Sequence, residues 1–360
     1  MYQLFKPLIF CLEPETAHNL AIKFLKFCPR LATILAYPID YSNLNNKVFD
    51  LDFSSPIGLS AGFDKNCEVA KTLIKFGFGF IEVGTTTPLA QIGNEQPRIF
   101  RLNQDQAIIN RLGFNNLGAD VFFENLQSLN QSLGNNSKKI IGVNIGKNKD
   151  TINAIDDYKL LIEKFYNHAN YITINISSPN TKNLRYLQNE QTLYDFLQAI
   201  DNTKQKLKAI SKINTPILLK IAPDLDFDQQ QSIAKIALQS KISGLIISNT
   251  SVARDFNLKS KNADQLGGLS GKPIFEISNQ VLKNIYHFTE GKLPIIGVGG
   301  ISSAQDVYRK IKLGASLVQI YTALIYQGFG MIEKLNQQLS ELLIKDGYKN
   351  IKQAIGVDNN

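Results

Sequence analysis

The most regular feature of the chain is a series of eight short apolar segments, most of them rich in Ile or Val. They span residues 56–61, 79–85, 140–146, 171–176, 216–221, 244–248, 294–299 and 317–321. Most are continuously apolar rather than alternating, which is typical of parallel strands that are buried on both faces. Between them, apolar residues recur at helical spacing, most clearly in residues 156–168, 193–210, 228–239 and 304–313.

A strand followed by a helix, repeated eight times, predicts an α/β fold of the (β/α)8 TIM barrel type. A doubly wound open sheet is the alternative arrangement of such units. The number of units and the Gly-Val-Gly-Gly sequence at residues 297–300 both favour the barrel.

Two segments lie outside this repeat. Residues 1–40 precede the first strand, so we expect an N-terminal helical segment, a barrel at 41–345 and a tail at 346–360. Residues 86–140 are longer than a simple crossover and contain short extended pieces near residues 98–102 and 107–110.

The N-terminal segment, defined as residues 1–40, is amphipathic and then apolar. One helical face carries Ala17, Leu20, Ala21, Phe24, Leu25 and Cys28, and the side chains that face elsewhere are His18, Asn19, Lys23 and Lys26. Residues 31–37 are apolar on nearly all sides. This pattern alone favours a helical pair packed on the barrel wall. No stretch reaches the ~18 uncharged apolar residues of a spanning helix, so we expect contact with a membrane without a crossing.

Charge and cysteine content narrow the function classes. Lys and Arg number 39 against 31 Asp and Glu, a net charge of +8, which suits anionic ligands, phosphates or an acidic lipid surface. The basic residues are scattered, which argues against nucleic acid. The 3 cysteines show neither metal nor redox spacing, so we expect a reducing compartment and no disulfide.

The predicted strand ends carry the candidate chemistry, because active sites of barrels lie at the carboxyl ends of the strands. Amide and hydroxyl side chains dominate there, with Lys65 and Lys220 as two cations. No end supplies a cluster of His, Cys and carboxylates, so we expect no metal site. His18, His168 and His287 all fall in predicted helices, which excludes a Ser-His-Asp triad. These ends predict a site for a flat polar molecule and a phosphate.

The phosphate signal is the glycine-rich turn at 297–300, followed by a helix. Glycines let the backbone approach an anion, and a helix N-terminus offers free N–H groups. The alternative is a tight turn without a ligand, but phosphate sites of barrels lie after strands seven and eight.

The lysines and asparagines indicate what else is bound. Lys65 and Lys220 follow buried strands, where a bare ammonium is costly, and a reduced flavin would offset that cost with its negative charge. Five asparagines near the strand ends suit a pyrimidine carboxylate, because each amide both donates and accepts: Asn110, Asn144, Asn175, Asn180 and Asn249.

Five motifs in order resemble those of the dihydroorotate dehydrogenases. They are AGFDK at 61–65, NRLGFNN at 110–116, NISSPNT at 175–181, GGLSG at 267–271 and IGVGG at 296–300. The resemblance runs from the first helix to about residue 335. It implies the TIM barrel fold, an oxidoreductase that uses FMN, and the substrate pair dihydroorotate and orotate.

The resemblance also implies roles for individual residues. The implied FMN contacts are Ala61, Gly62, Phe63, Asp64, Lys65, Thr85, Asn144, Asn175, Lys220, Ser248, Gly271, Gly300, Tyr321 and Thr322. The implied contacts of dihydroorotate and orotate are Lys65, Asn110, Arg111, Leu112, Gly113, Phe114, Asn175, Asn180, Asn249 and Thr250. Ser178 is the implied catalytic base. Ser248 stands where relatives often have Thr, and it retains the hydroxyl.

Two features indicate the class within this family. Relatives that use fumarate or a nicotinamide-linked partner subunit usually have Cys as the base, where this chain has Ser178, and they begin close to the first strand. The resemblance therefore implies the membrane-associated class 2, which passes electrons to membrane quinone and needs no partner subunit. Its members lie peripherally at the cytoplasmic face of the cell membrane. The N-terminal helices would form the quinone entrance, with His18, Arg101 and Tyr321 around the tunnel.

The implied reaction belongs to de novo pyrimidine (UMP) biosynthesis. Ser178 removes a proton from dihydroorotate while a hydride passes to FMN, and quinone then reoxidises the flavin. Thr181 is a candidate for a proton relay, and residues 180–190 are a candidate lid. Because every implied FMN and orotate contact lies at residue 61 or later, we expect the N-terminal segment to serve the quinone half-reaction only.

Two alternatives remain at this point. A soluble dihydroorotate or dihydropyrimidine enzyme would show a cysteine base or an iron–sulfur set of cysteines. A non-catalytic phosphate-binding barrel at a membrane would purify without colour.

Overall fold

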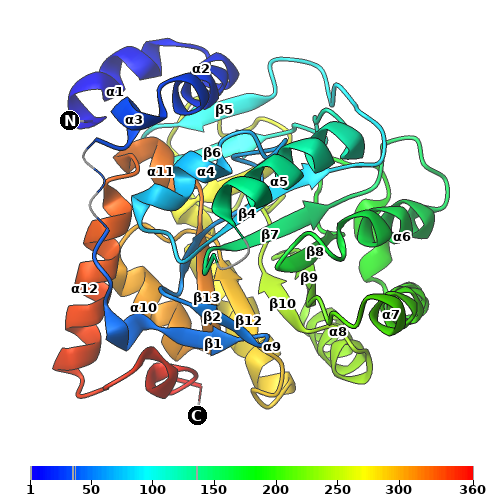
Figure 1. Ribbon diagram of the computed structural model, residues 1–360. Helices are drawn as coiled ribbons and strands as arrows, with labels where there is room; N and C mark the ends of the chain where they lie inside the picture. Colours follow the sequence, from blue (N-terminus) through cyan, green and yellow to red (C-terminus); the bar gives the residue numbers. More distant parts are fainter. Residues whose placement is uncertain (1, 35, 37, 135–136, 360) are drawn as a thin grey trace.

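The computed structural model describes residues 2–34, 36, 38–134 and 137–359, and its centre is a closed barrel of eight parallel strands (Figure 1). The strands are β3 (Ile57–Leu59), β4 (Phe80–Thr86), β7 (Ile140–Ile145), β8 (Tyr171–Asn175), β9 (Ile217–Ile221), β10 (Gly244–Ile247), β12 (Ile295–Val298) and β13 (Ala315–Ile320). They neighbour one another in chain order, and β13 pairs with β3 to close the barrel. Each strand falls within or across one of the eight apolar segments, which confirms the predicted fold.

Helices connect the strands and cover the outside of the barrel (Figure 1). They are α4 (Ala70–Leu73), α5 (Ala119–Leu133), α6 (Ala154–Phe165), α7 (Glu190–Ser211), α8 (Phe227–Gln239), α9 (Phe275–Phe288), α10 (Ala304–Lys312) and α12 (Met331–Lys345). The helix predicted at 156–168 ends at Phe165, so His168 lies in the following turn and not in a helix.

A short hairpin closes the amino-terminal end of the barrel. It consists of β1 (Asn46–Val48) and β2 (Leu51–Phe53), and the buried Phe53 ring meets the ring of Phe80 edge-on at 5.3 Å. Space is tight inside this end, since a Cβ on Gly142 would lie 2.1 Å from the Tyr171 ring. Because the amino-terminal end of the barrel is tightly packed, room for ligands is expected toward the carboxyl ends of the strands.

A second sheet stands beside the barrel mouth. Its antiparallel strands are β5 (Ile99–Leu102), β6 (Ala107–Asn110) and β11 (Gly268–Gly271), and the first two match the predicted extended pieces. The helices α1 (Tyr2–Cys11), α2 (Pro14–Phe27) and α3 (Pro29–Ala32) lie at this end of the molecule, with α2 next to β5 (Figure 1).

The N-terminal segment is tied to the last helices of the chain. The Tyr2 hydroxyl donates to Ile325 O in α11 (Thr322–Gln327) at 2.5 Å. Farther along, the Glu333 carboxylate in α12 accepts the Tyr41 hydroxyl at 2.9 Å and the Ile39 N–H at 3.1 Å. After α12, the predicted tail folds back onto α10, where Asp358 pairs with Lys312 at 2.9 Å.

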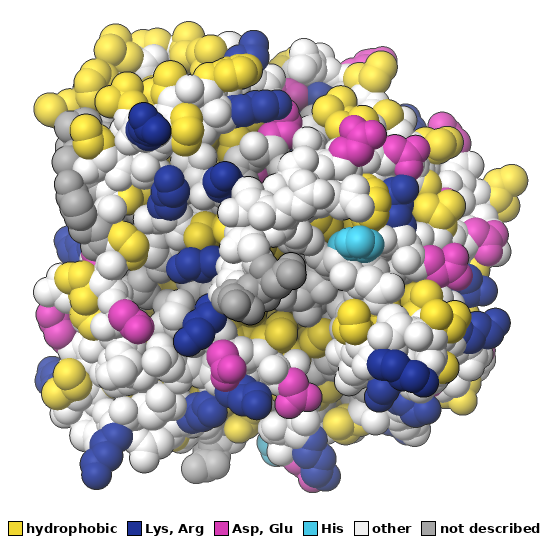
Figure 2. Space-filling view, in the orientation of Figure 1, with side chains coloured by type: hydrophobic (Ala, Val, Ile, Leu, Met, Phe, Trp, Pro, Cys, Tyr) yellow, Lys and Arg dark blue, Asp and Glu magenta, His cyan; other side chains and the backbone are white. Residues whose placement is uncertain are grey.

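The outer face of the N-terminal segment is unusually apolar. Hydrophobic side chains gather over these helices (Figure 2), and the most exposed are Leu4, Leu8 and Phe27, at 79%, 69% and 73%. In the apolar run at 31–37, Leu35 and Tyr37 lie outside the described residues. Across the part of the chain that the structure describes, no helix is both long and apolar enough to cross a membrane.

Candidate active site in the barrel mouth

One large cavity, of about 1660 Å³, begins at the carboxyl ends of the strands and continues to the N-terminal helices. Its inner part is lined by Lys65, Ser178 and Lys220 from three strand ends. Its outer part is lined by apolar side chains of the N-terminal segment: Leu8, Leu12, Leu20, Phe24, Leu31 and Ile34. The cavity thus has a polar end inside the barrel and an apolar end near the surface.

A buried carboxylate organises the layer beneath the polar end. Glu82 in β4 is fully buried, and it accepts hydrogen bonds from Asn144 Nδ2 at 2.7 Å and Gln319 Nε2 at 2.8 Å. The hydroxyls of Tyr171 and Thr173 donate to its Oε2 at 3.1 and 3.0 Å. These bonds satisfy polar oxygen atoms whose burial inside a barrel would otherwise be costly. They also fix the side chains on which ligands would rest.

The two lysines have few partners of their own. Lys220 Nζ donates to Ser60 Oγ at 3.3 Å, and burial lowers the pKa of its ammonium. Lys65 Nζ lies 3.4 Å from His18 Nε2, and removal from water lowers the pKa of Lys65 to about 8. Both side chains reach the cavity, as the strand-end argument predicted.

The asparagines form two hydrogen-bonded groups, a network around Asn175 and a separate pair, Asn110 and Asn180. Asn175 Nδ2 donates to Thr85 Oγ1 and to Asn144 Oδ1, both at 3.3 Å. Its Oδ1 accepts from Asn249 Nδ2 at 3.2 Å, and Asn180 Nδ2 donates to Asn110 O at 3.1 Å. Such a network holds each amide in one orientation and leaves its remaining donors and acceptors for a ligand.

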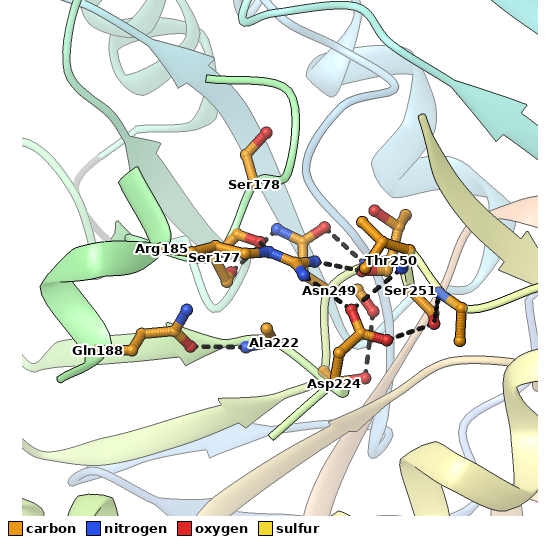
Figure 3. A network of polar contacts seen from close by, with 12 residues as sticks. Ser177, Ser178, Arg185, Gln188, Ala222, Asp224, Asn249, Thr250 and Ser251 are labelled. Atoms are coloured by element: carbon orange, nitrogen blue, oxygen red, sulfur yellow. Dashed lines mark hydrogen bonds and ion pairs between the residues drawn. The ribbon is translucent and has the colours of Figure 1, made fainter. Parts of the chain in front are cut away.

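Ser178 is buried, at 7% exposure, in the loop after β8. Its Oγ accepts the Asn180 N–H at 3.3 Å, and no imidazole or carboxylate of the described chain bonds to it. The neighbouring Ser177 hydroxyl belongs to the amide network, where it accepts from Asn249 Nδ2 at 2.9 Å. In Figure 3 the Ser178 hydroxyl points away from this network.

An arginine ties the Ser178 loop to two further strand ends. Arg185, in the 3-10 turn Leu184–Gln188, donates to Ser177 O at 3.0 Å and to Thr250 O at 2.9 Å. Its guanidinium also pairs with Asp224 at 2.7 Å, and Asp224 accepts the Ser251 hydroxyl and the Val252 N–H (Figure 3). The sequence motifs did not point to this pair, because Arg185 lies outside them.

The glycine turn after β12 has the form of an anion cradle. A Cβ on Gly300 would lie 2.5 Å from Phe275 Cβ, and φ is +75° there, so only glycine fits. No hydrogen bond within residues 2–34, 36, 38–134 and 137–359 uses the N–H groups of Gly299 or Gly300. These unbonded N–H groups indicate an anion site. The Thr322 hydroxyl belongs to a residue that lines the same cavity.

The start of α10 provides fewer free N–H groups than the sequence suggested. The Asp306 carboxylate accepts the N–H groups of Ser302 at 2.8 Å and Ser303 at 3.0 Å. A carboxylate of the same helix therefore takes two N–H groups just before this terminus, so an anion relies mainly on the glycines.

The residues present fit FMN. The glycine turn suits its phosphate, and Lys220 supplies a cation beside the expected ring position. Gln319 Oε1 is buried without a partner among the described residues and lines the cavity, so it can accept from a ring N–H. No cluster of three metal-ligating side chains occurs in the described part of the chain.

Most of the residues singled out in the sequence line this one cavity. They are Ala61, Gly62, Phe63, Lys65, Thr85, Asn110, Leu112, Gly113, Phe114, Asn175, Ser178, Asn180, Lys220, Ser248, Asn249, Thr250, Gly271, Gly300, Tyr321 and Thr322. Asp64, Asn144 and Arg111 lie outside the lining. Asp64 accepts hydrogen bonds from the N–H groups of Glu68 and Val69. Asn144 Oδ1 accepts a hydrogen bond from the Thr85 hydroxyl at 2.5 Å. Arg111 packs over the Phe100 ring and donates to Pro97 O.

Sequence reasoning missed Glu82, Gln319 and Arg185. A signal existed for the first two, because each is a polar residue inside a continuously apolar segment. It also assigned His18 to the polar face of its helix. In the structure the His18 ring faces the barrel, 5.3 Å from Phe63, and burial lowers its pKa well below the usual value. His18, Arg101 and Tyr321, which were expected around the quinone tunnel, all line the cavity.

Comparison with known proteins gives a consistent answer. The family model described as dihydroorotate dehydrogenase matches residues 43–343. A protein of Parvibaculum lavamentivorans named dihydroorotate dehydrogenase (quinone) is 45% identical over 100% of this chain and 99% of its own length. One of Rhodopseudomonas palustris with the same name is 43% identical over 98% and 94%. The crystal structure of DHODH from Eimeria tenella in complex with ferulenol is 38% identical, with a TM-score of 0.90 and 96% of both chains covered.

Proposed function

This chain belongs to the dihydroorotate dehydrogenase family and oxidises (S)-dihydroorotate to orotate with a quinone as final acceptor, and we propose that it uses FMN at the barrel mouth with Ser178 as the catalytic base. The reaction is a step of pyrimidine biosynthesis. One observation carries the proposal: a single cavity brings together Ser178, two lysines and four of the five asparagines, and then opens toward an apolar surface.

The chain's residues would hold FMN by two ends. The N–H groups of Gly299 and Gly300 and the Thr322 hydroxyl suit the phosphate, whereas Lys220 and Gln319 suit the ring. When bound there, FMN supplies the hydride acceptor. The Lys220 ammonium would stabilise negative charge on the ring, and that charge would in turn favour the protonated form of Lys220 in this buried position.

The substrate would lie among the asparagines. Lys65 offers a cation for the carboxylate of dihydroorotate, and Asn110, Asn180 and Asn249 match the donors and acceptors of its ring. In this position Ser178 reaches the ring carbon that is bonded to a carbonyl group. Ser178 takes the proton of that carbon. A hydride would leave the neighbouring carbon at the same stage and pass to bound FMN.

A serine hydroxyl is a weak base in water, so its surroundings have to assist it. The Thr181 hydroxyl is buried without a partner in the described chain, which suits it to pass the proton onward. The loop held by Arg185 would exclude water while the proton moves. Among the described residues, no cysteine lines the cavity, which separates this chain from relatives that use a cysteine base.

We infer that the N-terminal segment meets an anionic lipid surface and admits quinone. The apolar end of the cavity lies beneath Leu8 and Leu20, and exposed apolar side chains surround it. Basic residues near membrane headgroups strengthen such peripheral binding, and Lys6, Lys23 and Arg30 belong to the same helices. We propose that no partner subunit is required, because one chain supplies every residue of the proposed site.

The test compares the wild-type holoenzyme with Ser178→Ala. Both proteins should be yellow and release FMN on denaturation, and both should bind orotate. Without air, reduction of the flavin by dihydroorotate should be slower in the variant by roughly 10²–10⁴, the usual effect of losing a positioned base. Stopped-flow absorbance of the flavin measures this rate.

Ser177→Ala is the matched control. Its hydroxyl bonds to Asn175 Oδ1 at 3.0 Å and lies in the amide network, so its loss should weaken orotate binding more than it slows the reaction. A colourless wild-type protein would refute the FMN assignment. Near-normal reduction in Ser178→Ala would mean that another group is the base.

A further inference from the structure

The N-terminal segment is joined to the barrel by a buried ion pair. Glu15, in the first turn of α2, and Arg98, just before β5, are 7% and 5% exposed. Arg98 Nε donates to Glu15 Oε2 at 2.9 Å and Nη2 donates to Oε1 at 2.6 Å. These bonds from Arg98 lower the pKa of the Glu15 carboxyl, so the pair is charged at neutral pH. A two-point contact of this kind fixes the orientation of the guanidinium plane.

The other arm of Arg98 reaches the loop between β4 and β5. Arg98 Nη1 donates to Ile92 O and to Asn94 O, each at 2.7 Å. The ion pair therefore sets the position of the loop backbone at Asn94. A neutral side chain at position 98 could not make these contacts and hold Glu15 at the same time.

Asn94 in turn touches both sides of the proposed dihydroorotate site. Its Nδ2 donates to Arg111 O at 2.9 Å and to Asn180 O at 3.3 Å. Its backbone N–H donates to Leu112 O at 3.0 Å, and its side chain packs where a Cβ on Gly113 would lie. Asn94 thus bridges the 110–114 wall and the loop that carries Ser178.

We propose that Glu15 is a positioning residue for dihydroorotate, which acts through Arg98 and Asn94 on the 110–114 wall and on Asn180. This inference rests on the proposed function, because it takes those residues as the substrate wall. It changes the expectation that the N-terminal segment serves only the quinone half-reaction. A helix at the lipid surface is here connected to the binding of the water-soluble substrate.

The same helix provides an internal comparison. Lys26 also joins α2 to the barrel, through Glu68 at 2.8 Å, but this pair is exposed, at 45% and 23%. In the described chain neither of its side chains bonds to residues 110–114. Loosening the segment at Lys26 should leave the substrate wall in place. A change at Glu15 leaves the buried Arg98 guanidinium without its counter-charge. The guanidinium then has to move or recruit water.

The experiment measures orotate binding to the oxidised holoenzyme through the change in flavin absorbance. Glu15→Gln should weaken orotate binding by about tenfold or more, the scale of losing a charged hydrogen bond. Flavin content and the KM for decylubiquinone should stay close to wild type. Lys26→Gln should bind orotate normally. Asn94→Ala, which leaves the ion pair intact, should weaken orotate binding to a similar extent, and its effect should not add to that of Glu15→Gln.

The outcomes separate this inference from the proposed function. A wild-type protein without flavin, or without a response to orotate, would refute the proposed function. If wild type binds orotate and Glu15→Gln binds it equally well, only the positioning role is refuted. Equal weakening in Lys26→Gln would also refute it, because the effect would then be a general loosening of α2. If Glu15→Gln does not fold, normal orotate affinity in Asn94→Ala refutes the positioning role in its place.

Discussion

At the scale of single residues, Lys310 is the most unusual side chain outside the cavity. It is fully buried in α10, and its Nζ donates to Ser278 Oγ and Asn279 Oδ1, both at 2.8 Å. No carboxylate pairs with it among the described residues, and burial lowers its pKa to about 7. Ser278 Oγ also lies 3.2 Å from Gly299 O, so this ammonium stands directly behind the glycine turn.

This pKa gives a stability prediction with a defined sign. The folded-state pKa of Lys310 is about 7, well below the usual 10.5 of an unfolded lysine, so between these values the unfolded state binds the extra proton. Stability should therefore rise with pH in this window. Lys310→Met removes the effect, and its unfolding free energy relative to wild type should fall by about 2 kcal/mol between pH 7 and pH 9.

Urea unfolding of the two proteins at pH 7 and pH 9 measures this difference. Lys345→Met, at the end of α12 and on the surface, serves as the control and should track wild type at both values. A constant difference between wild type and Lys310→Met would contradict the assigned pKa of the buried ammonium.

Some residues could be found from the sequence, and the reason is geometric. Lys220, Asn144 and Asn175 lie near the carboxyl ends of apolar barrel strands, and a barrel brings all such positions to one end. Lys65, Asn180 and Asn249 lie in the loops that follow such strands. Lys310 and Arg98 gave no such signal, because their partners come from distant parts of the chain. Helical spacing put His18 on the polar face, but the direction of α2 is set by Glu15 and Arg98, which periodicity does not contain.

At the scale of elements, the loop after β8 is held closed from outside the cavity. The Arg185–Asp224 pair connects it to the ends of β9 and β10. Asp224→Asn keeps the shape and removes the charge. We expect orotate affinity to fall by about tenfold, because the loop loses a charged hydrogen bond, and hydrogen exchange in residues 180–190 to become faster.

Asp226→Asn is a close control for that change. Asp226 lies two positions farther and caps α8 through Gln229 N at 2.8 Å, a role that Asn also performs well. It should leave orotate affinity and exchange in the loop unchanged. Unaltered exchange in Asp224→Asn would show that other contacts keep the loop closed.

The strand and helix pattern predicted the barrel and its order, because each unit buries a continuous apolar strand under one helix. The elements that cross between units were harder to predict. The extended pieces at 98–102 and 107–110 were visible, but β11, the second partner of the piece at 107–110, lies more than 150 residues later, at Gly268–Gly271. Only the folded barrel brings these strands together.

At the scale of the whole molecule, the exposed apolar side chains of the N-terminal helices and the net charge of +8 both favour binding to an anionic lipid surface. We expect the protein to co-sediment with vesicles that contain phosphatidylglycerol, and less so at high salt, which screens the charges. Phe27→Ser should weaken this binding by about tenfold, because it removes a large apolar side chain from the contact.

Ile210→Ser is the matched control for the vesicle experiment. Ile210 is even more exposed than Phe27, at 82% against 73%, but it lies in α7 on the barrel. The change should not affect vesicle binding. Equal binding by wild type and Phe27→Ser would place the lipid contact on another face.

The contact between the N-terminal helices and the last helices also fixes an order of events during translation. Tyr2 and its partner Ile325 are 323 residues apart, so α1 leaves the ribosome long before its docking site exists. At typical rates of synthesis this interval is about 15–65 s. During that time the apolar face of the nascent helices has no barrel to cover it, and lipid or a chaperone is its available partner. The newborn chain can therefore find the membrane before it completes its fold.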